Sequence, residues 1–177
     1  MAHPLPRSTA LPAPVERARW IPLTKGKWAL VDDEDYEEMN RWSWYCNNSY
    51  AARDFRENGV RVNLKMHRAI TNTPAELEVD HRNGDKLDNR RKNLRIATHA
   101  QNLKNMKKHK DNSTGFKGVK KVSCRVNKTN PYQAIIMVDG KSHSLGYFLT
   151  PEAAAQAYDK GARELHGEYS RTNKDTQ

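Results

Sequence analysis

The sequence predicts an α+β protein assembled from small antiparallel sheets and short helices. Brief alternations of apolar and polar residues recur along the 177-residue chain, separated by turn dipeptides such as Asn58-Gly59 and Asp139-Gly140, as in β-hairpins. A helical pattern follows the last alternation, between Thr150 and Gly167. Because 36% of the residues are hydrophobic and 29% are charged, we expect small cores, in one medium domain or in two or three small ones.

Changes in composition along the chain predict four parts. Residues 1–18 contain several prolines and no apolar cluster, which indicates a disordered leader. We expect a small β-rich segment at 19–66, a central core at 67–111, and a separate sheet-and-helix unit at 112–177.

The β-rich segment begins with two short strands between Trp20 and Val31, joined at Lys25-Gly26. An acidic helix follows from Asp32-Asp33, with its carboxylates placed favourably at the N-terminus.

A second hairpin is expected between Trp44–Phe55 and Val60–Leu64, with Asn58-Gly59 as its turn. A short helix follows at Lys65–Ile70. The four tryptophans of the chain fall in the β-rich segment, where we expect them in a core or at a sheet edge rather than stacked on bases.

The central core begins with a strand, a polar loop, a second strand and a helix. Alternation at Leu77-Glu78-Val79 and again at Leu94-Arg95-Ile96 predicts two short strands separated by a basic loop. Thr98, followed three residues later by Gln101, forms a capping-box signature that predicts the start of a helix.

Three polar residues of this stretch are chemically complementary. Asp80 and His81 leave the first strand, and Asn102 falls in the first helical turn. A carboxylate and an amide oxygen are hard ligands of the kind that Mg²⁺ or Mn²⁺ accepts. An imidazole can take a proton from water near neutral pH. A metal and a base beside a basic loop suggest hydrolysis of a phosphodiester.

The pairs Asp80-His81, Asn93-Leu94 and Gln101-Asn102 resemble, in order and spacing, the motif of the HNH (ββα-metal) endonucleases, particularly the phage homing endonucleases of the HNN type. The resemblance implies that Asp80 and Asn102 hold one divalent ion, that His81 is the general base, and that Asn93 braces the loop carrying His81. It also implies a 5′-phosphate product and favours nicking over a double-strand break. The alternative is a strand-loop-helix whose polar residues merely cap and turn the chain, and the full set of spacings argues against it.

His67 and Arg68 match a His-Arg pair that HNN-type proteins commonly carry ahead of the motif. The resemblance implies a catalytic position for His67, near the scissile phosphate. A histidine on the helix surface with a local hydrogen bond is an equal alternative.

The net charge of +10 and the pI near 9.7 indicate a polyanionic partner, with nucleic acid first and a membrane surface second. From Lys104 to Lys121 there are seven lysines and one acid; such a run is often only a solvated segment, but beside a nuclease motif it favours contact with DNA phosphates. The longest apolar run, residues 134–138, is far too short to span a bilayer. The contacts to DNA expected ahead of the C-terminal unit are Arg82, Arg90, Arg91, Lys104, Lys107 and Lys108.

The C-terminal unit is predicted to pack three strands on one helix. The strands are expected at Phe116–Val122, Tyr132–Val138 and His143–Phe148. The helix is framed by Thr150 as N-cap and Gly167 beyond its end. Its expected inward face consists of Ala154, Tyr158, Gly161 and Leu165.

These segments resemble the APETALA-two/ethylene-response-factor (AP-two/ERF) DNA-binding domain along nearly its whole length. The resemblance implies a sheet that enters the major groove, with Lys117, Lys120 and Gln133 at contact positions. The chain departs from the family where Ile135, Met137 and Ser144 replace charged or aromatic residues. Apolar side chains there either meet thymine methyl groups or are covered by another part of the protein.

Together these patterns predict a metal-dependent HNH endonuclease that hydrolyses double-stranded DNA, as a site-specific homing or nicking enzyme of the phage type. The alternative is a DNA-binding regulator with an inactive nuclease motif, and an RNA-directed nuclease is a weaker third possibility. No small-molecule cofactor is expected. Two isolated cysteines and no secretory signal favour the cytoplasm, that of a host cell if the protein is encoded by a phage.

Overall fold

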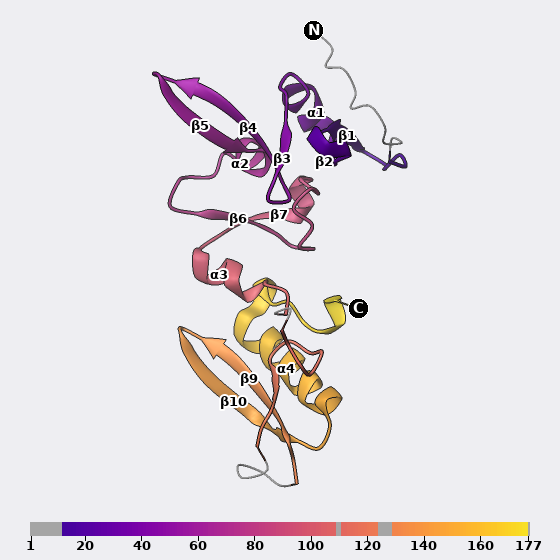
Figure 1. Ribbon diagram of the computed structural model, residues 1–177, viewed down its shortest axis with the longest axis vertical. Coiled ribbons are helices and arrows are strands. Elements are labelled where there is room, and N and C mark those ends of the chain that lie inside the picture. Colours follow the sequence, from indigo (N-terminus) through magenta and orange to yellow (C-terminus); the bar gives the residue numbers. More distant parts are fainter. Residues whose placement is uncertain (1–11, 109–110, 124–128, 177) are drawn as a thin grey trace. The chain divides into compact units, whose positions relative to one another are not determined.

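The computed structural model describes residues 12–108, 111–123 and 129–176. The chain divides into two compact units, the first ending at Thr98 and the second beginning at His99 (Figure 1). Most of the predicted leader lies outside the described residues. Its described end contacts the first unit, because Val15 forms a β-bridge with Ala18 and the indole of Trp20 donates to the carbonyl of Ala13 at 2.9 Å.

The first unit contains three small antiparallel sheets, formed by β1–β2, β3–β4–β5 and β6–β7. Its elements in chain order are β1 (Ala18–Pro22), η1 (Thr24–Gly26), β2 (Trp28–Asp32), α1 (Asp33–Met39), β3 (Tyr45–Asn47), β4 (Tyr50–Glu57), β5 (Val60–Lys65), α2 (Met66–Thr71), β6 (Glu78–His81), η2 (Arg91–Asn93) and β7 (Leu94–Ala97).

Both predicted hairpins of the β-rich segment are confirmed, and Asn58 and Gly59 take the positive φ angles of 49° and 80° that a tight two-residue turn requires. The single strand expected over Trp44–Phe55 was wrong. Asn48 and Ser49 also have positive φ, 47° and 68°, so the chain reverses there and β3 pairs with the start of β4.

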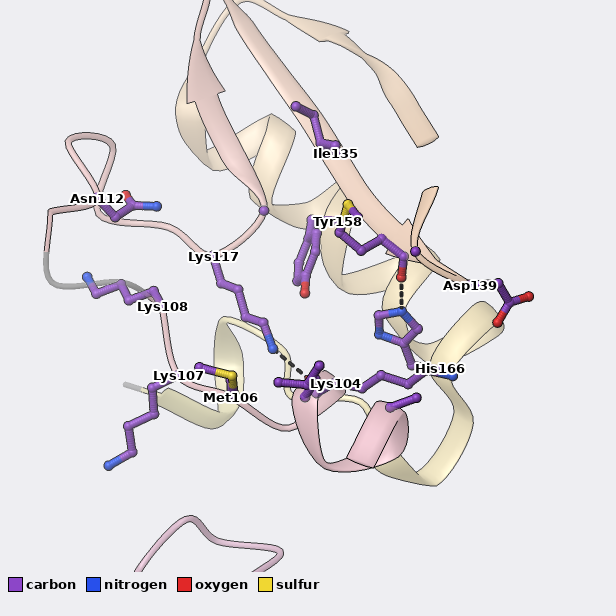
Figure 2. A pocket seen from close by; sticks show the side chains of 15 residues that line it. Lys104, Met106, Lys107, Lys108, Asn112, Lys117, Ile135, Asp139, Tyr158 and His166 are labelled. Atoms are coloured by element: carbon purple, nitrogen blue, oxygen red, sulfur yellow. Dashed lines mark hydrogen bonds between the residues drawn. The ribbon is translucent and has the colours of Figure 1, made fainter. Parts of the chain in front are cut away.

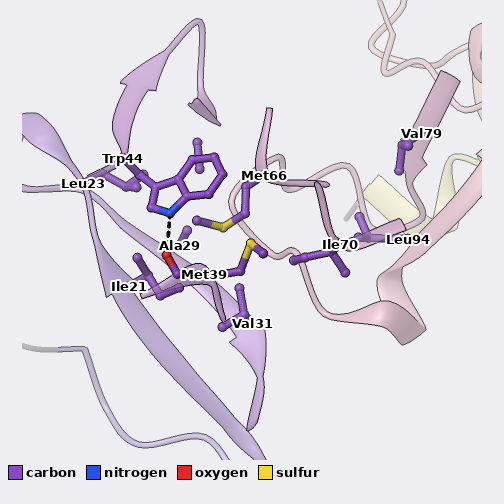
Figure 3. Close-up of a cluster of buried hydrophobic side chains, with 11 residues drawn as sticks. Ile21, Leu23, Ala29, Val31, Met39, Trp44, Met66, Ile70, Val79 and Leu94 are labelled. Carbon is purple, nitrogen blue, oxygen red and sulfur yellow. Dashed lines mark hydrogen bonds between the residues drawn. The ribbon is translucent and has the colours of Figure 1, made fainter. Parts of the chain in front are cut away.

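One hydrophobic core extends from β1 to β7 (Figure 3). The indole of Trp44 is buried in it and donates to the carbonyl of Met39 at 2.8 Å. Val79 of β6 and Leu94 of β7 belong to the same cluster as Ile21 of β1. The β-rich segment and the hairpin bearing Asp80 and His81 are therefore one folding unit rather than separate parts.

The second unit has a three-stranded antiparallel sheet in the order β10-β9-β8, with α4 packed on one face. Its elements are α3 (His99–Lys104), β8 (Val119–Lys121), β9 (Tyr132–Val138), β10 (Lys141–Phe148), α4 (Pro151–His166), η3 (Gly167–Tyr169) and η4 (Lys174–Thr176). The mixture of helices and small antiparallel sheets agrees with the predicted α+β class. Among the described residues, no helix is long and apolar enough to cross a membrane.

The division between the two compact units falls between Thr98 and His99, so α3 lies in the second unit. The ammonium of Lys117 donates to the carbonyl of Lys104 at the end of α3, at 2.7 Å. Arg171 donates to the carbonyl of Asn105, one residue further on, at 3.4 Å. These contacts attach α3 to the sheet-and-helix unit.

The inward face of α4 is correct except at Leu165. Thr150 caps the helix as predicted, accepting from the backbone of Ala153 at 3.2 Å. Ala154, Tyr158 and Gly161 are buried, but Leu165 is 47% exposed. In the last turn His166 takes the inward position instead, because its ring nitrogen lies 2.8 Å from the carbonyl oxygen of Met137 in β9.

Gly115 and Gly118 of the second unit differ in the space around their Cα atoms. Gly118 and Gly115 have similar φ angles, +72° and +80°, but a Cβ on Gly118 would lie 1.9 Å from the ring of Tyr158 and one on Gly115 would meet nothing. We expect Gly115→Ala to lower the free energy of unfolding by about 1 kcal/mol, through backbone strain alone. Gly118→Ala should lose about 1–3 kcal/mol more through overpacking. Urea unfolding followed by far-UV circular dichroism measures both, and equal losses would show that Tyr158 moves away without cost.

Candidate active site

The β6–β7 hairpin brings the predicted catalytic residues to the end of one strand. Asp80 pairs with Arg95 and His81 with Leu94 across this antiparallel ladder. Directly opposed residues lie on the same face of a hairpin, and successive residues lie on opposite faces. Asp80 therefore faces Arg95, and His81 points to the other side.

Asp80 forms a buried ion pair with Arg95. Nε and Nη2 of Arg95 both donate to Oδ2 of Asp80, at 2.8 and 2.5 Å, and the side chains are each only 6% exposed. A carboxylate in such a position needs a compensating charge, and removing one partner of a buried pair costs about 3–5 kcal/mol. Asp80 thus supports the folded hairpin whatever it does in catalysis.

His81 is buried in a cluster of rings. Its ring centroid lies 5.1 Å from that of His67 and 6.0 Å from that of Tyr50. Burial lowers the pKa of His81 below the ordinary value of 6.5, against a smaller opposing effect from a 3.5 Å contact with Oδ1 of Asn89 and from nearby carboxylates. A lowered pKa keeps the imidazole neutral at pH 7, which is the form that accepts a proton.

His67 is 4% exposed, so it is not the surface histidine of the alternative interpretation. Its ring meets that of Tyr50 edge-on at 5.2 Å. Burial first, and then the neighbouring His81, lower the pKa of His67 to about 3. The structure thus places His67 against the proposed base, and a direct contact with the scissile phosphate stays a prediction.

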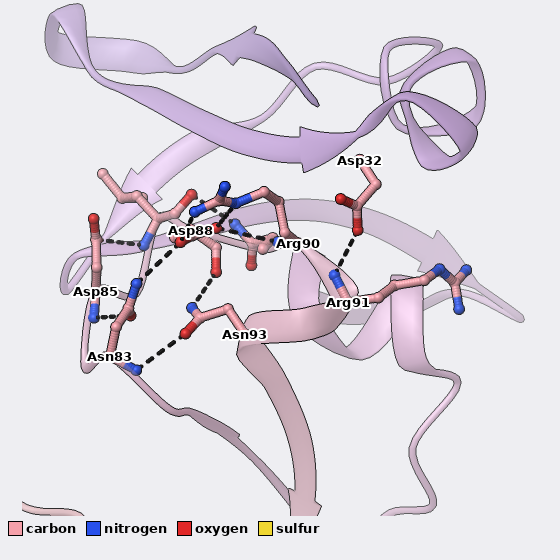
Figure 4. Close-up of polar contacts among 9 residues, drawn as sticks. Asp32, Asn83, Asp85, Asp88, Arg90, Arg91 and Asn93 are labelled. Atoms are coloured by element: carbon pink, nitrogen blue, oxygen red, sulfur yellow. Dashed lines mark hydrogen bonds and ion pairs between the residues drawn. The ribbon is translucent and has the colours of Figure 1, made fainter. Parts of the chain in front are cut away.

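Asn93 connects both sides of the loop between β6 and β7 (Figure 4). Its Oδ1 accepts from the backbone of Asn83 at 3.0 Å, and its Nδ2 donates to the carbonyl of Asp88 at 2.7 Å. Its own carbonyl accepts from Arg82 at 2.9 Å. These are the contacts expected of a residue that braces the loop, and the effect on catalysis stays a prediction.

The arginines of the loop have carboxylate partners within the first unit. Arg90 donates to both oxygens of Asp88 at 2.7 Å. The guanidinium of Arg91 binds Asp35 of α1 at 2.9 and 2.6 Å, and its backbone donates to Asp32 at 2.7 Å. The pKa of each arginine is raised by these partners. Their predicted contacts with DNA therefore compete with ion pairs that hold the loop in place.

Asn102 lies in the first turn of α3, as predicted, and α3 belongs to the second unit. The sharing of one ion by Asp80 and Asn102 stays a prediction. In the part of the chain that the structure describes, no cluster of three or more His, Cys, Asp or Glu could hold a metal. One carboxylate and one amide oxygen nevertheless fit Mg²⁺, which is often held by one or two protein ligands and completed by water and substrate phosphate.

Four of the predicted DNA-binding lysines line one pocket of the second unit, with a volume of about 430 Å³ (Figure 2). They are Lys104, Lys107, Lys108 and Lys117. Apolar side chains from α3, the following turn, β9 and α4 complete its walls, namely those of Ala100, Leu103, Met106, Ile135, Met137 and Tyr158.

Lys117 does not lie on the first strand of the sheet but two residues before β8. Burial lowers the pKa of Lys117 to about 8, and its ammonium is bound to α3, so it has a structural role. Lys120 is exposed on β8, opposite Gln133, whose amide donates to Ser144 at 2.8 Å. The sequence left open whether Ile135 and Met137 meet thymine methyl groups or are covered by another part of the protein. Both side chains line the pocket that contains the four lysines.

Sequence reasoning missed the partners that set the environment of the site. In the sequence, Arg95 served only as the polar residue of an alternating strand pattern, although the register of the two strands places it opposite Asp80. Sequence reasoning also missed that the ring of Tyr50 lies near His81 and that the ammonium of Lys86 lies over the ring of Tyr50. No local pattern links Tyr50 to His81, which follows it by 31 positions in the sequence, so only the folded chain brings these rings together.

A hairpin that presents an acid and a histidine beside a braced polar loop defines a candidate nuclease centre. Residues 72–104 match the family model described as HNH endonuclease. A protein of Acanthamoeba polyphaga mimivirus, named an uncharacterized HNH endonuclease, is 32% identical over 152 residues, covering 85% of this chain and 76% of the relative. Protein 3.8 of Escherichia phage T7 is 32% identical over 98 residues, 55% of this chain and 77% of the relative. No solved structure matches significantly.

The chain therefore belongs to the HNH endonuclease family. Membership indicates a nuclease that acts on DNA, and nucleases of this family generally use a divalent metal ion.

The buried His67 gives a prediction for stability against pH. The unfolded chain binds a proton at His67 near pH 6.5, whereas the folded chain holds the ring neutral down to about pH 3. The free energy of unfolding should therefore fall as pH falls through this window, by about 1.4 kcal/mol per pH unit for this one proton. His67→Phe removes the titration and should make the decline shallower.

All four tryptophans lie in the first unit, so urea unfolding followed by tryptophan fluorescence measures this dependence. His143→Phe, at an exposed histidine of the second unit, is the control and should leave the slope unchanged. An unchanged slope in His67→Phe would show that His67 is protonated in the folded protein.

Proposed function

We propose that this protein is a metal-dependent endonuclease that nicks double-stranded DNA at specific sites, in the manner of the phage homing endonucleases. The observation that supports this most strongly is a buried His81 next to Asp80, with a pKa lowered by burial, within the segment that matches the HNH model. The basic second unit, with its lysine-lined pocket, supports duplex DNA as the substrate.

In the proposed reaction His81 takes a proton from the water that attacks phosphorus, because its lowered pKa leaves the ring nitrogen ready to accept. Asp80 and Asn102 hold a divalent ion, Mg²⁺ or Mn²⁺. When bound, this ion supplies charge stabilisation at the phosphoryl group and at the departing 3′-oxygen. Asn93 keeps His81 in place through the loop, as an outer residue that orients the reacting group.

In this proposal the second unit binds the duplex through its basic residues. Lys104, Lys107 and Lys108 contribute charge that tracks the backbone without reading sequence. Lys120 and Gln133 stand together on the exposed face of the sheet, the position that a sheet-type reader uses.

One observation favours the alternative of a DNA-binding regulator with an inactive nuclease motif. Arg95 already occupies Oδ2 of Asp80. Relaxation of supercoiled plasmid that requires Mg²⁺ or Mn²⁺ and stops with EDTA separates the two functions. A regulator would bind the plasmid and leave it supercoiled.

Replacing His81 tests the base. We expect His81→Asn to slow nicking by about 10²–10⁴-fold, the usual contribution of a general base, while affinity for DNA stays near the parental value. The parental rate under single-turnover conditions should stay nearly constant as pH falls to 6.5 and decline only at lower pH, because burial lowers the pKa of His81 below its ordinary value. A variant that nicks at the parental rate would remove His81 from this role.

Replacing Asp80 tests the metal, and the choice of substituent matters. Asp80→Ala would leave Arg95 buried without its carboxylate, so misfolding would obscure the result. Asp80→Asn keeps an oxygen for Arg95 and should still abolish nearly all activity. Asn102→Asp should retain some activity with an altered metal preference, since it adds a hard oxygen.

Electron paramagnetic resonance of Mn²⁺ with protein and duplex gives a readout besides cleavage. We expect Asp80→Asn to release bound Mn²⁺ and to melt at a lower temperature than the parent, because the buried charge of Arg95 is left without a carboxylate; circular dichroism at the assay temperature checks that the variant is folded. Normal cleavage by this variant in Mg²⁺ would rule out the metal site.

A further inference from the structure

Two lysines converge on one tyrosine ring beside the proposed base. Nζ of Lys65 lies 4.5 Å from the ring centroid of Tyr50, and Nζ of Lys86 lies 4.4 Å from it. The same ring contacts His67 and His81, at 5.2 and 6.0 Å between centroids. The ring of Tyr50 therefore lies near two positively charged lysines and near the ring of His81.

The backbone fixes where both lysines start. Lys65 pairs with Ala52 across β4 and β5, so it lies diagonally across from Tyr50 on the same face of the sheet. Lys86 comes from the loop after His81, where its neighbour Leu87 donates to Oδ1 of Asp85 at 3.0 Å. The carbonyl of Leu87 accepts from Leu30 of β2 at 2.8 Å, which attaches this part of the loop to the core.

The charges of these lysines are not compensated by acids. Among the described residues, neither Lys65 nor Lys86 forms an ion pair with a carboxylate, whereas Arg90 and Arg91 of the same loop both do. An aromatic face attracts an exposed ammonium by only about 0.5–1 kcal/mol. Both ammonium groups therefore keep a positive charge that an anion near the Tyr50 ring would attract.

Building on the proposed function, we infer that Lys65 and Lys86 bind one backbone phosphate of the strand being cut, and that Tyr50 is the positioning residue that holds them for it. Lysine binds phosphate as a point charge and needs no fixed geometry, and the ring of Tyr50, which both ammonium groups contact, limits where their flexible stems place that charge. The phosphate bound there lies beside His81, and the cut strand is held against the base.

Four variants and a charge control test this site in the full chain. Lys65→Met and Lys86→Met together remove both charges and retain side-chain length, and Lys65→Arg with Lys86→Arg restores the charge. Tyr50→Leu removes the ring, and Tyr50→Phe retains it. Lys92→Met removes an exposed charge from the same loop, outside the ring cluster.

Two measurements are made on each variant. The single-turnover nicking rate on supercoiled plasmid is taken at saturating protein, and affinity for a short mixed-sequence duplex is measured in EDTA over a range of salt concentrations. The double methionine variant should nick about 10–100-fold more slowly, and its logarithmic salt slope should be shallower by about 0.9, the value for one phosphate. Tyr50→Leu should lose rate similarly while Tyr50→Phe, the double arginine variant and Lys92→Met keep nearly the parental rate.

The outcomes separate this site from the proposed function. If the parent nicks and the double methionine variant keeps both the parental rate and the parental slope, the phosphate site is wrong and the nuclease stands. If the parent does not nick but the variant loses the expected slope, the phosphate site stands and the nuclease is wrong. Tyr50→Phe that is as slow as Tyr50→Leu would remove the ring from the positioning role, and a parent that does not bind duplex would overturn both proposals.

Discussion

The position of the β6–β7 hairpin depends on the polar network inside the loop that follows His81. Between Arg82 and Asn93 the loop has one apolar side chain, Leu87, which packs against the core, so burial of apolar surface holds the loop at this one point. Hydrogen bonds of Asn93, to Asn83 on one side and to Asp88 on the other, hold the rest of the loop. A loop braced by directional bonds keeps one conformation, which is what a base that must meet a water and a phosphate needs.

The same network joins the hairpin to distant parts of the first unit. Leu30 of β2 exchanges backbone hydrogen bonds with Leu87 and Asn89, and Arg91 reaches the acids of β2 and α1. The N-terminal elements therefore act as the support of the site rather than as a separate appendage. Asp80 adds the other constraint, because its buried pairing with Arg95 links β6 to β7 across the hairpin.

Local chemistry explains what the sequence could predict. Gly and Asn at turns and the cap at Thr150 are determined by neighbours in the chain, and these predictions agree with the structure. The strand expected over Trp44–Phe55 is interrupted by a turn, and the first strand of the C-terminal sheet is shorter than expected. Pairings that depend on register or on packing between distant elements were not predictable in this way. Arg95 against Asp80, Tyr50 against His81 and Lys117 against the end of α3 belong to this group. Leu165 was also predicted wrongly. It falls at an inward position of the helical pattern, but it is exposed because the sheet no longer covers the last turn of α4.

The arginines and the lysines of this positively charged chain have different roles. Arginines of the first unit hold the structure: Arg91 and Arg95 bind carboxylates, and Arg68 donates to the carbonyls of Leu77 and Pro74 between α2 and β6. A planar guanidinium suits these roles because it forms several directional bonds at once. Lysines such as Lys65, Lys86 and Lys107 carry charge on flexible stems. In the loop between β6 and β7, Arg90 and Arg91 are bound to carboxylates, whereas Lys86 forms no ion pair with a carboxylate among the described residues.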